Sequence, residues 1–340
     1  MLRDAALVHY KLYGLEVESD RPLPGVTPCD RVSSPDISCH LGELPARLAP
    51  TQMRAEHPIY SSPFKDSNGL PILRIWRFSR TGHYCFQYCE GATFVIDRNG
   101  GEIWAEWSDG ATLEEVTAFL LHQVFGFVLH LRNCMCVHAS AVVIDGWAVL
   151  FAGNAGAGKS STAAAFAERG HPVLADDVST LKMEADGELM AIPSVPGICL
   201  WPDSAEMIYG GSAAERFPRL QPREEKKLVR LDSAPGKFQS EPAPLGALYL
   251  LARRSADPTA PRIEPLGDSE GLIQLLTNGY VSGALEPWWR AREFQMQGEI
   301  ARRVPVQRLV PSNDPKLLGR LCDLIVSDVR AAKLPLASGR

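Results

Sequence analysis

The residues best suited to chemistry stand in one glycine-rich octapeptide at 153–160, with the sequence Gly-Asn-Ala-Gly-Ala-Gly-Lys-Ser. It matches the complete P-loop pattern G-x-x-x-x-G-K-[ST]. In such a loop the backbone N–H groups point at phosphate oxygens, the lysine faces the β- and γ-phosphates, and the serine hydroxyl can ligate Mg²⁺. We therefore expect ATP and Mg²⁺ as cofactors, with ATP bound by Gly153, Asn154, Ala155, Gly156, Ala157, Gly158, Lys159, Ser160 and Ser161.

Two other interpretations of this loop are weaker. A plain turn between a strand and a helix has no need for Lys159 and Ser160. A dinucleotide-binding loop is excluded, because Ser161 stands where the last glycine of G-x-G-x-x-G would be.

Two consecutive acids, Asp176 and Asp177, follow a short apolar run at 172–175. A strand that ends in a carboxylate at this distance after the P-loop lysine is where a Mg²⁺-holding aspartate is expected. A pair allows one acid to serve the metal and the other to accept a proton. A solvated strand end is the alternative. His138, at the start of the strand pair that leads to the loop, fits a structural or a functional role equally well.

Other polar residues carry weaker signals. Lys226, Lys227 and Arg230 form a basic cluster that fits either phosphate binding or a solvated face, and we favour the solvated face. Among the eight cysteines, the closely spaced pairs at 85/89 and 134/136 match no common zinc pattern, so we expect structural thiols and no metal–cysteine site.

Composition excludes several classes of protein. The 340 residues are 45% hydrophobic and 22% charged with a net charge of −5, which argues against a disordered chain and against a generic nucleic-acid binder. Residues 1–20 lack a signal-peptide core, and the apolar stretch 116–131 is interrupted and too short to span a bilayer. We expect a cytoplasmic protein with no nucleic-acid and no membrane partner.

The elements that must position these residues divide into two regions. Residues 1–110 are predicted to be β-rich, with a hairpin turn at 98–101 and strands at 7–17, 37–41, 72–78, 83–89, 92–96 and 102–107. Residues 111–335 are predicted to be an α/β domain that opens with a capping box at 112–115. Its predicted strands are 137–144, 147–151, 172–175, 178–183, 188–192, 247–252 and 304–310, and its helices 112–131, 159–168, 269–278, 287–303 and 315–332.

The region from His138 to Val178 resembles the catalytic domain of HPr serine kinase/phosphorylase. The resemblance rests on His138, the P-loop and the segment 169–177, Arg-Gly-His-Pro-Val-Leu-Ala-Asp-Asp, in the same order. It implies a P-loop kinase fold on a mixed sheet, like that of phosphoenolpyruvate carboxykinase. It also implies that Asp176 is the general base, that Asp177 assists at Mg²⁺ with Ser160, and that His138 orients the acidic pair.

A broader resemblance changes the expected substrate. Residues 192–203 lack the E-x-R-G-x-G pattern of that family, whereas 13–24 resemble the start of HPr-kinase-related proteins of peptide maturation, such as lasso-peptide kinases. These phosphorylate a serine of a precursor peptide, so a peptide or small protein with an acceptor serine is the expected partner. The family's hexamers also make a homo-oligomer an expected assembly.

Together these observations predict a serine kinase whose catalytic residues are Asp176, Asp177, His138 and Lys159, preceded by a β-rich region that recognises or presents the substrate. Two alternatives stay open: a nucleotide-gated regulatory module without phosphoryl transfer, and a kinase of a small hydroxylated metabolite.

Overall fold

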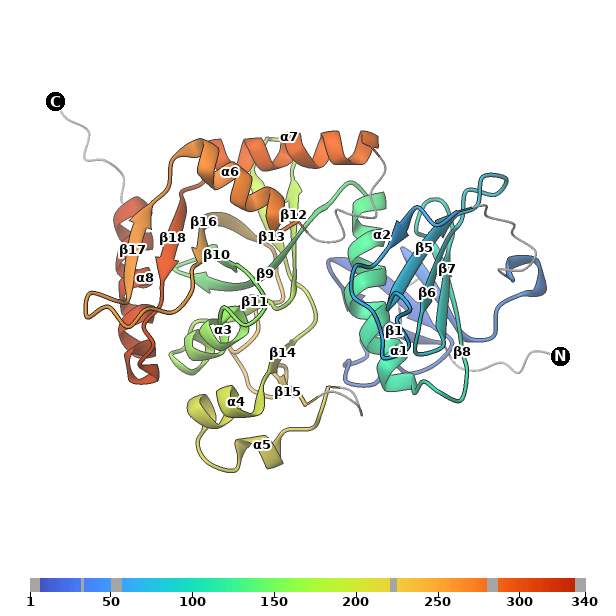
Figure 1. The fold of residues 1–340 in the computed structure, drawn as a ribbon, viewed down its shortest axis with the longest axis horizontal. Coiled ribbons are helices and arrows are strands. Elements are labelled where there is room, and N and C mark those ends of the chain that lie inside the picture. The colour runs from blue at the N-terminus through green and yellow to red at the C-terminus, as the bar shows by residue number, and fades with distance from the viewer. Residues whose placement is uncertain (1–6, 32–33, 50–56, 221–224, 280–286, 334–340) are drawn as a thin grey trace. The chain divides into compact units, whose positions relative to one another are not determined.

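The chain divides into two compact units, which we call the N-terminal and C-terminal units. The first comprises Met1–Cys134 with Val281–Pro287, and the second comprises Met135–Tyr280 with Trp288–Arg340. The structure is a computed structural model that describes residues 7–31, 34–49, 57–220, 225–279 and 287–333 (Figure 1).

The N-terminal unit is built on an eight-stranded sheet. Its order is β1-β2-β3-β8-β7-β6-β5-β4, in which β2–β3 and β3–β8 are parallel pairs. The strands are β1 (Val8–Leu12), β2 (Leu15–Ser19), β3 (Ile37–Gly42), β4 (Tyr60–Ser61), β5 (Leu73–Arg77), β6 (Tyr84–Tyr88), β7 (Ala92–Ile96) and β8 (Glu102–Trp107), with a short helix η1 (Ala46–Leu48). The predicted β-rich region is confirmed, and so is its turn, where Asp97 Oδ1 accepts from the N–H groups of Gly101 and Glu102.

One predicted strand is wrong. Residues 7–17 do not form a single strand but the hairpin β1–β2, whose turn is Tyr13 and Gly14. Both residues have positive φ, 53° and 72°, the geometry of a tight hairpin turn. Apolar residues recur on both sides of Gly14, and this pattern concealed the reversal.

The helical segment that follows belongs to the N-terminal unit. It consists of α1 (Leu113–Phe119), a π-helical turn η2 (Leu120–Val124) and α2 (Phe125–Leu131), and it begins with the predicted capping box. Phe125 stacks on Tyr13 and Phe127 lies edge-on to Phe86, which fixes the helix to the sheet. The boundary therefore falls after Cys134 rather than at the expected 110/111.

The C-terminal unit is built on a mixed sheet of order β10-β9-β12-β13-β16-β18-β17, with β11 paired to β9. The strands are β9 (Met135–Ile144), β10 (Trp147–Ala152), β11 (Val173–Ala175), β12 (Val178–Met183), β13 (Leu189–Ile192), β16 (Ala243–Leu251), β17 (Arg262–Pro265) and β18 (Val306–Val310), and a separate hairpin is formed by β14 (Gly197–Leu200) and β15 (Lys227–Arg230). Strand β16 is parallel to both β10 and β18. Because β10 pairs with β9 and with β16, strands β10, β9, β12, β13 and β16 form a closed ring of pairings.

Helices cover both faces of this sheet (Figure 1). They are α3 (Lys159–Glu168), α4 (Pro202–Tyr209), α5 (Ala213–Arg216), α6 (Asp268–Thr277), α7 (Pro287–Arg303), η4 (Pro315–Leu317) and α8 (Leu318–Lys333). Val149 and Phe151 of β10 pack into one core with α3 and α8, whereas the alternate residue Leu150 packs into the other with α6 and α7. The expected mixed α/β architecture is confirmed.

The segment after Ile192 holds elements that the sequence did not predict. Strands β14, β15 and β17 have four residues each, and α5 also has four. Elements this short show no readable hydrophobic periodicity, which needs a window of 11–18 residues. The hairpin β14–β15 nevertheless contributes to the site described next.

Candidate active site

The glycine-rich loop connects the end of β10 to the start of α3, as expected. Gly153, Gly156 and Gly158 have φ values of 148°, 79° and 106°, a region that favours glycine. A Cβ atom at Gly153 would lie 2.9 Å from the carbonyl oxygen of Leu251, a fixed backbone atom. The Leu251 carbonyl group on β16 therefore leaves room only for glycine at position 153, where the loop begins.

Lys159 is the cation at the centre of the loop. Its side chain is 7% exposed, and its Nζ donates to the carbonyl oxygens of Gly153 at 2.8 Å and Asn154 at 3.3 Å. Burial lowers the pKa of Lys159, whereas the charges of Asp177 and Asp176 act in the opposite direction. The ammonium group is thus enclosed by the loop and lies within electrostatic reach of both acids.

Asp176 is held inside the C-terminal unit by several donors. Its Oδ1 accepts from Ser140 Oγ at 2.6 Å and its Oδ2 from the backbone N–H of Cys199 at 2.9 Å. The nearby hydroxyl of Ser160, in the P-loop, acts to lower the pKa of this carboxylate, against the larger effect of burial. At 8% exposure, Asp176 therefore has one oxygen bonded to β9 and the other to β14.

Asp177 is more accessible. It adopts the left-handed conformation with φ of 67°, and its Oδ1 lies 3.2 Å from His138 Nε2. The side chains of Asp177 and His138 are 34% and 40% exposed. The backbone explains the contact, because β12 pairs with β9 in a register that sets Val178 opposite His138.

The structure thus places the expected site residues close together, along with two partners that the sequence did not indicate. Ser140 is two residues after His138 on β9, so both side chains leave the same face of the strand toward the acidic pair. The N–H of Cys199 comes from β14, which was not predicted. A polar serine at i+2 from His138 was the available signal for Ser140.

Lys226 of the basic cluster lies near the site. Its ammonium is 5.7 Å from the ring centroid of Trp201, and its charge contributes to lowering the pKa of Lys159. Arg230, by contrast, forms an ion pair with Asp232. The favoured interpretation of the cluster as a purely solvated face is therefore incomplete for Lys226.

The residues present fit a nucleotide phosphate chain with Mg²⁺. The cradle offers backbone N–H groups and one buried ammonium, and open space adjoins Gly156, where a Cβ would meet nothing within 4 Å. Mg²⁺ is usually held by one or two protein oxygens together with substrate phosphates and water. Ser160 with a carboxylate of the acidic pair meets that requirement. Within the described ranges, no group of three or more His, Cys, Asp or Glu residues forms another metal site.

Replacing Asp176 with asparagine is expected to stabilise the protein at neutral pH. Burial raises the pKa of Asp176, so its contribution to stability is present below the unfolded pKa of about 3.9 and is lost as pH rises through the folded value. An asparagine can still accept from the Cys199 N–H and donate to Ser140 Oγ, but it carries no buried charge. We expect Tm to rise by about 2–4 °C at pH 7.5 and to match the wild type near pH 4.

Thermal denaturation at the two pH values measures this difference. Asp177→Asn is the matched control, because its carboxylate is a third exposed and faces His138. A loss of stability of equal size at both pH values in the Asp176 variant would contradict the expectation.

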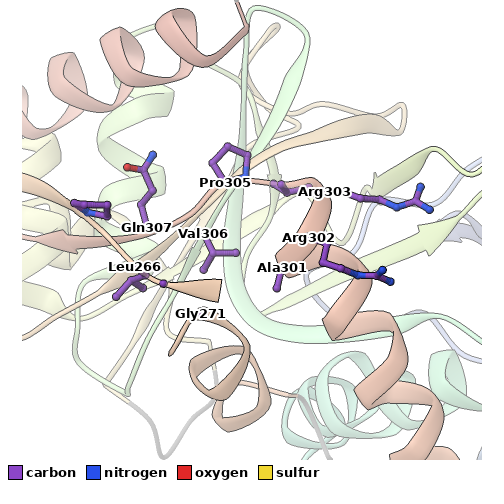
Figure 2. A pocket seen from close by; sticks show the side chains of 11 residues that line it. Leu266, Gly271, Ala301, Arg302, Arg303, Pro305, Val306 and Gln307 are labelled. Carbon is purple, nitrogen blue, oxygen red and sulfur yellow. The ribbon is translucent and has the colours of Figure 1, made fainter. Parts of the chain in front are cut away.

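A separate pocket of the C-terminal unit is bounded by the ends of β17 and α7 and by the starts of α6 and β18 (Figure 2). Its two arginines are already engaged, since Arg302 pairs with Glu299, and Arg303 donates both to Glu299 and to the carbonyl oxygen of Gly187. The lining residues whose side chains the structure describes include no acid, histidine or cysteine.

Similarity to known proteins is found among solved structures, and it is distant. No protein-family model and no curated protein matches the chain. Among solved structures, the chain is similar to the HPr(Ser) kinase/phosphatase from Coxiella burnetii, with 18% identity, a TM-score of 0.32, and coverage of 58% of this chain and 99% of that one. A likeness this distant does not assign a family, so the inference of function depends on the residues of the site.

In the part of the chain that the structure describes, no helix has both the length and the apolar character needed to cross a bilayer.

Proposed function

We propose that the chain is an ATP- and Mg²⁺-dependent kinase that transfers the γ-phosphoryl group to a serine hydroxyl of a peptide or small protein. The observation that carries this proposal is that the P-loop and the acidic pair lie on either side of the same part of β9, since Ala152 is paired with Ala139 and Val178 with His138. At this place Asp177 is accessible and paired with His138. Phosphoryl transfer requires this combination of a phosphate cradle, a metal-side carboxylate and an acid next to the acceptor.

The geometry supports a division of roles opposite to the one implied by the resemblance. Asp176 is enclosed and its oxygens accept from Ser140 Oγ and the Cys199 N–H, which suits the metal side of the site, near Ser160. Asp177 is accessible and oriented by His138, which suits the general base. We therefore propose Asp177, rather than Asp176, as the base, and Asp176, rather than Asp177, as the partner of Ser160 at Mg²⁺.

In this mechanism the chain's own groups position the reactants and neutralise the charge of the phosphates. The loop amides and Lys159 hold the β- and γ-phosphates, and bound Mg²⁺ supplies further positive charge. Asp177 accepts the proton of the acceptor hydroxyl as that oxygen bonds to the γ-phosphorus and the bond from phosphorus to the β–γ bridging oxygen breaks. His138 keeps the Asp177 carboxylate in place and is a positioning residue.

We assign recognition of the acceptor to the N-terminal unit, with a precursor peptide of natural-product maturation as the proposed substrate. Support comes from the segment next to β4, the last strand in the sheet order, where Phe64 and Leu70 are 72% and 50% exposed. Exposed apolar residues beside a terminal strand suit an extended peptide that adds to the sheet.

The test incubates the purified chain with γ-labelled ATP, Mg²⁺ and a panel of serine-containing peptides. We expect label on the serine of some peptides and none on matched peptides with alanine. ATP hydrolysis without transfer to any peptide, protein or hydroxylated metabolite would refute the kinase proposal and favour the regulatory module.

A further inference from the structure

The N-terminal unit contains a pocket of its own, which we call the Glu106 pocket. It opens to solvent and has a volume of about 440 Å³, within the size range of small-molecule sites. It lies where β3 and β8 end and β7 begins, since Glu106 is paired with Gly42 and with Thr93. Phe94, next to Thr93, is paired with Phe86, which contacts α2. Because side chains alternate along a strand, Thr93 and Glu106 lie on the face of the sheet away from that helix.

Three polar side chains line the Glu106 pocket without partners. Within the described ranges, Glu43 and Glu106 make no ion pair and no side-chain hydrogen bond. Thr93 is only 7% exposed, and its hydroxyl also has no hydrogen-bond partner in the described part of the chain. The pocket therefore offers several hydrogen-bond acceptors and negative charge, which favours a cation that carries several N–H donors.

Trp107 adds an aromatic wall, and the chain itself places a guanidinium against it. The Cζ atom of Arg21 is 5.7 Å from the centroid of the Trp107 ring. Arg21 is exposed, does not line the pocket and, among the described residues, forms no ion pair with either glutamate. The Trp107 ring thus accepts a guanidinium, which is planar and stacks on aromatic rings, while both carboxylates are left without a cation in contact.

Two glycines keep the walls of the Glu106 pocket free of side chains. Gly42 and Gly91 have φ values of 129° and 96°, a region that favours glycine. A Cβ atom at Gly91 would collide with Ser108, and one at Gly42 would collide with the guanidinium of Arg21. The opening is therefore a feature of the backbone and does not depend on the rotamer of a side chain.

We propose that the Glu106 pocket binds the guanidinium of an arginine in the acceptor peptide, with Trp107 against its plane and with Glu43, Glu106 and Thr93 accepting its N–H groups. The planar fork of five donors matches this set of acceptors better than the single ammonium of a lysine does. The inference rests on the peptide substrate of the proposed function. It adds a specificity to that function, since the N-terminal unit then selects peptides that contain arginine.

The first test needs no variant of the protein. It measures, in the absence of ATP, the binding of fluorescent serine peptides that carry one arginine at successive positions, each with a twin in which neutral citrulline replaces arginine. We expect the best arginine peptide to bind about tenfold more tightly than its twin, as a partly desolvated ion pair with a cation–π contact provides. Equal affinities of both twins at every position would overturn the proposal.

The second test locates the discrimination in the pocket. Glu106→Gln should bring the affinities of the two twins to within about twofold of each other, because the charge that distinguishes them is gone. Glu102→Gln is the matched control: Glu102 lies on the same face of β8 but pairs with His40 and does not line the pocket. It should keep the full discrimination, and an equal loss in both variants would reduce the effect to general attraction by an acidic surface. Thr93→Val, which removes only the unpartnered hydroxyl, should weaken binding of the arginine peptide alone.

A third measurement separates the possible sources of the guanidinium and the two proposals. If calorimetry shows that free L-arginine binds and that Glu106→Gln abolishes this binding, while no peptide is distinguished from its twin, the ligand is a small guanidinium compound and the peptide assignment is wrong. Phosphorylation of serine peptides at equal rates with arginine or citrulline would overturn this inference and leave the proposed function intact. Arginine-dependent binding without transfer of phosphate to any peptide would overturn the proposed function and leave the pocket's specificity in place.

Discussion

Replacing Asp177 with asparagine is expected to lower kcat for phosphoryl transfer by about 10²–10⁴-fold, the range that general-base catalysis contributes. The amide cannot accept the proton of the acceptor hydroxyl. Asparagine tolerates the left-handed conformation found at this position, where φ is 67°, so the backbone should not change. Nucleotide affinity should stay within a few-fold, because the P-loop is untouched.

Steady-state kinetics with the labelled peptide and calorimetry with ATP measure these two quantities. Asp145→Asn is a matched control: Asp145 also has positive φ, at 49°, and its carboxylate pairs with Arg330 on the surface. If Asp177→Asn keeps full kcat while Asp176→Asn abolishes transfer without loss of ATP binding, the roles of the two acids must be exchanged.

Replacing Lys159 with methionine is expected to lower kcat/KM for ATP by about 10²–10³-fold, as the loss of one preorganised charge at a reacting phosphoryl group typically does. Methionine is an unbranched apolar side chain one atom shorter than lysine, so it suits this position, which is 7% exposed. It removes the charge that would otherwise face the phosphates. Calorimetry should show weaker binding of both ATP and inorganic tripolyphosphate.

The control for Lys159 is a lysine with a similar structural role at the other end of α3. Lys237 Nζ donates to Ala167 O at 2.6 Å and forms an ion pair with Glu168. Lys237→Met should therefore lower the unfolding temperature but leave ATP affinity unchanged. An equal loss of ATP affinity in both variants would mean that Lys159 acts by supporting α3 and not by binding phosphate.

Local sequence signals located the core of the site. The P-loop pattern placed the loop and α3 correctly, and the apolar run before Asp176 placed β11 close to its observed bounds. These signals succeed because a glycine-rich turn, a buried strand and a capped helix are each specified by residues within a few positions of one another. The mixed character of the sheet came instead from the family resemblance.

The environments of the two acids could not be predicted in the same way. Which acid is buried depends on Ser140 and on the N–H of Cys199, which are 36 and 23 residues away in the sequence. The accessible acid, Asp177, lies beside His138 because of the register in which β12 pairs with β9. Such contacts arise from tertiary pairing, which the residues next to each acid in the sequence do not specify.

The closed ring of strand pairings has a consequence for motion during turnover. Ser140 and His138 lie on β9, the P-loop leaves β10, and Asp177 immediately precedes β12, so all of them are attached to strands of one ring. Opening any one of these strands would break pairings on both of its sides, which makes local unfolding of this part costly. In the proposed reaction, substrate is therefore expected to enter and product to leave without the opening of these strands, while the hairpin β14–β15, outside the ring, donates an N–H to Asp176 and packs Ile198 and Leu200 into the core beside α3.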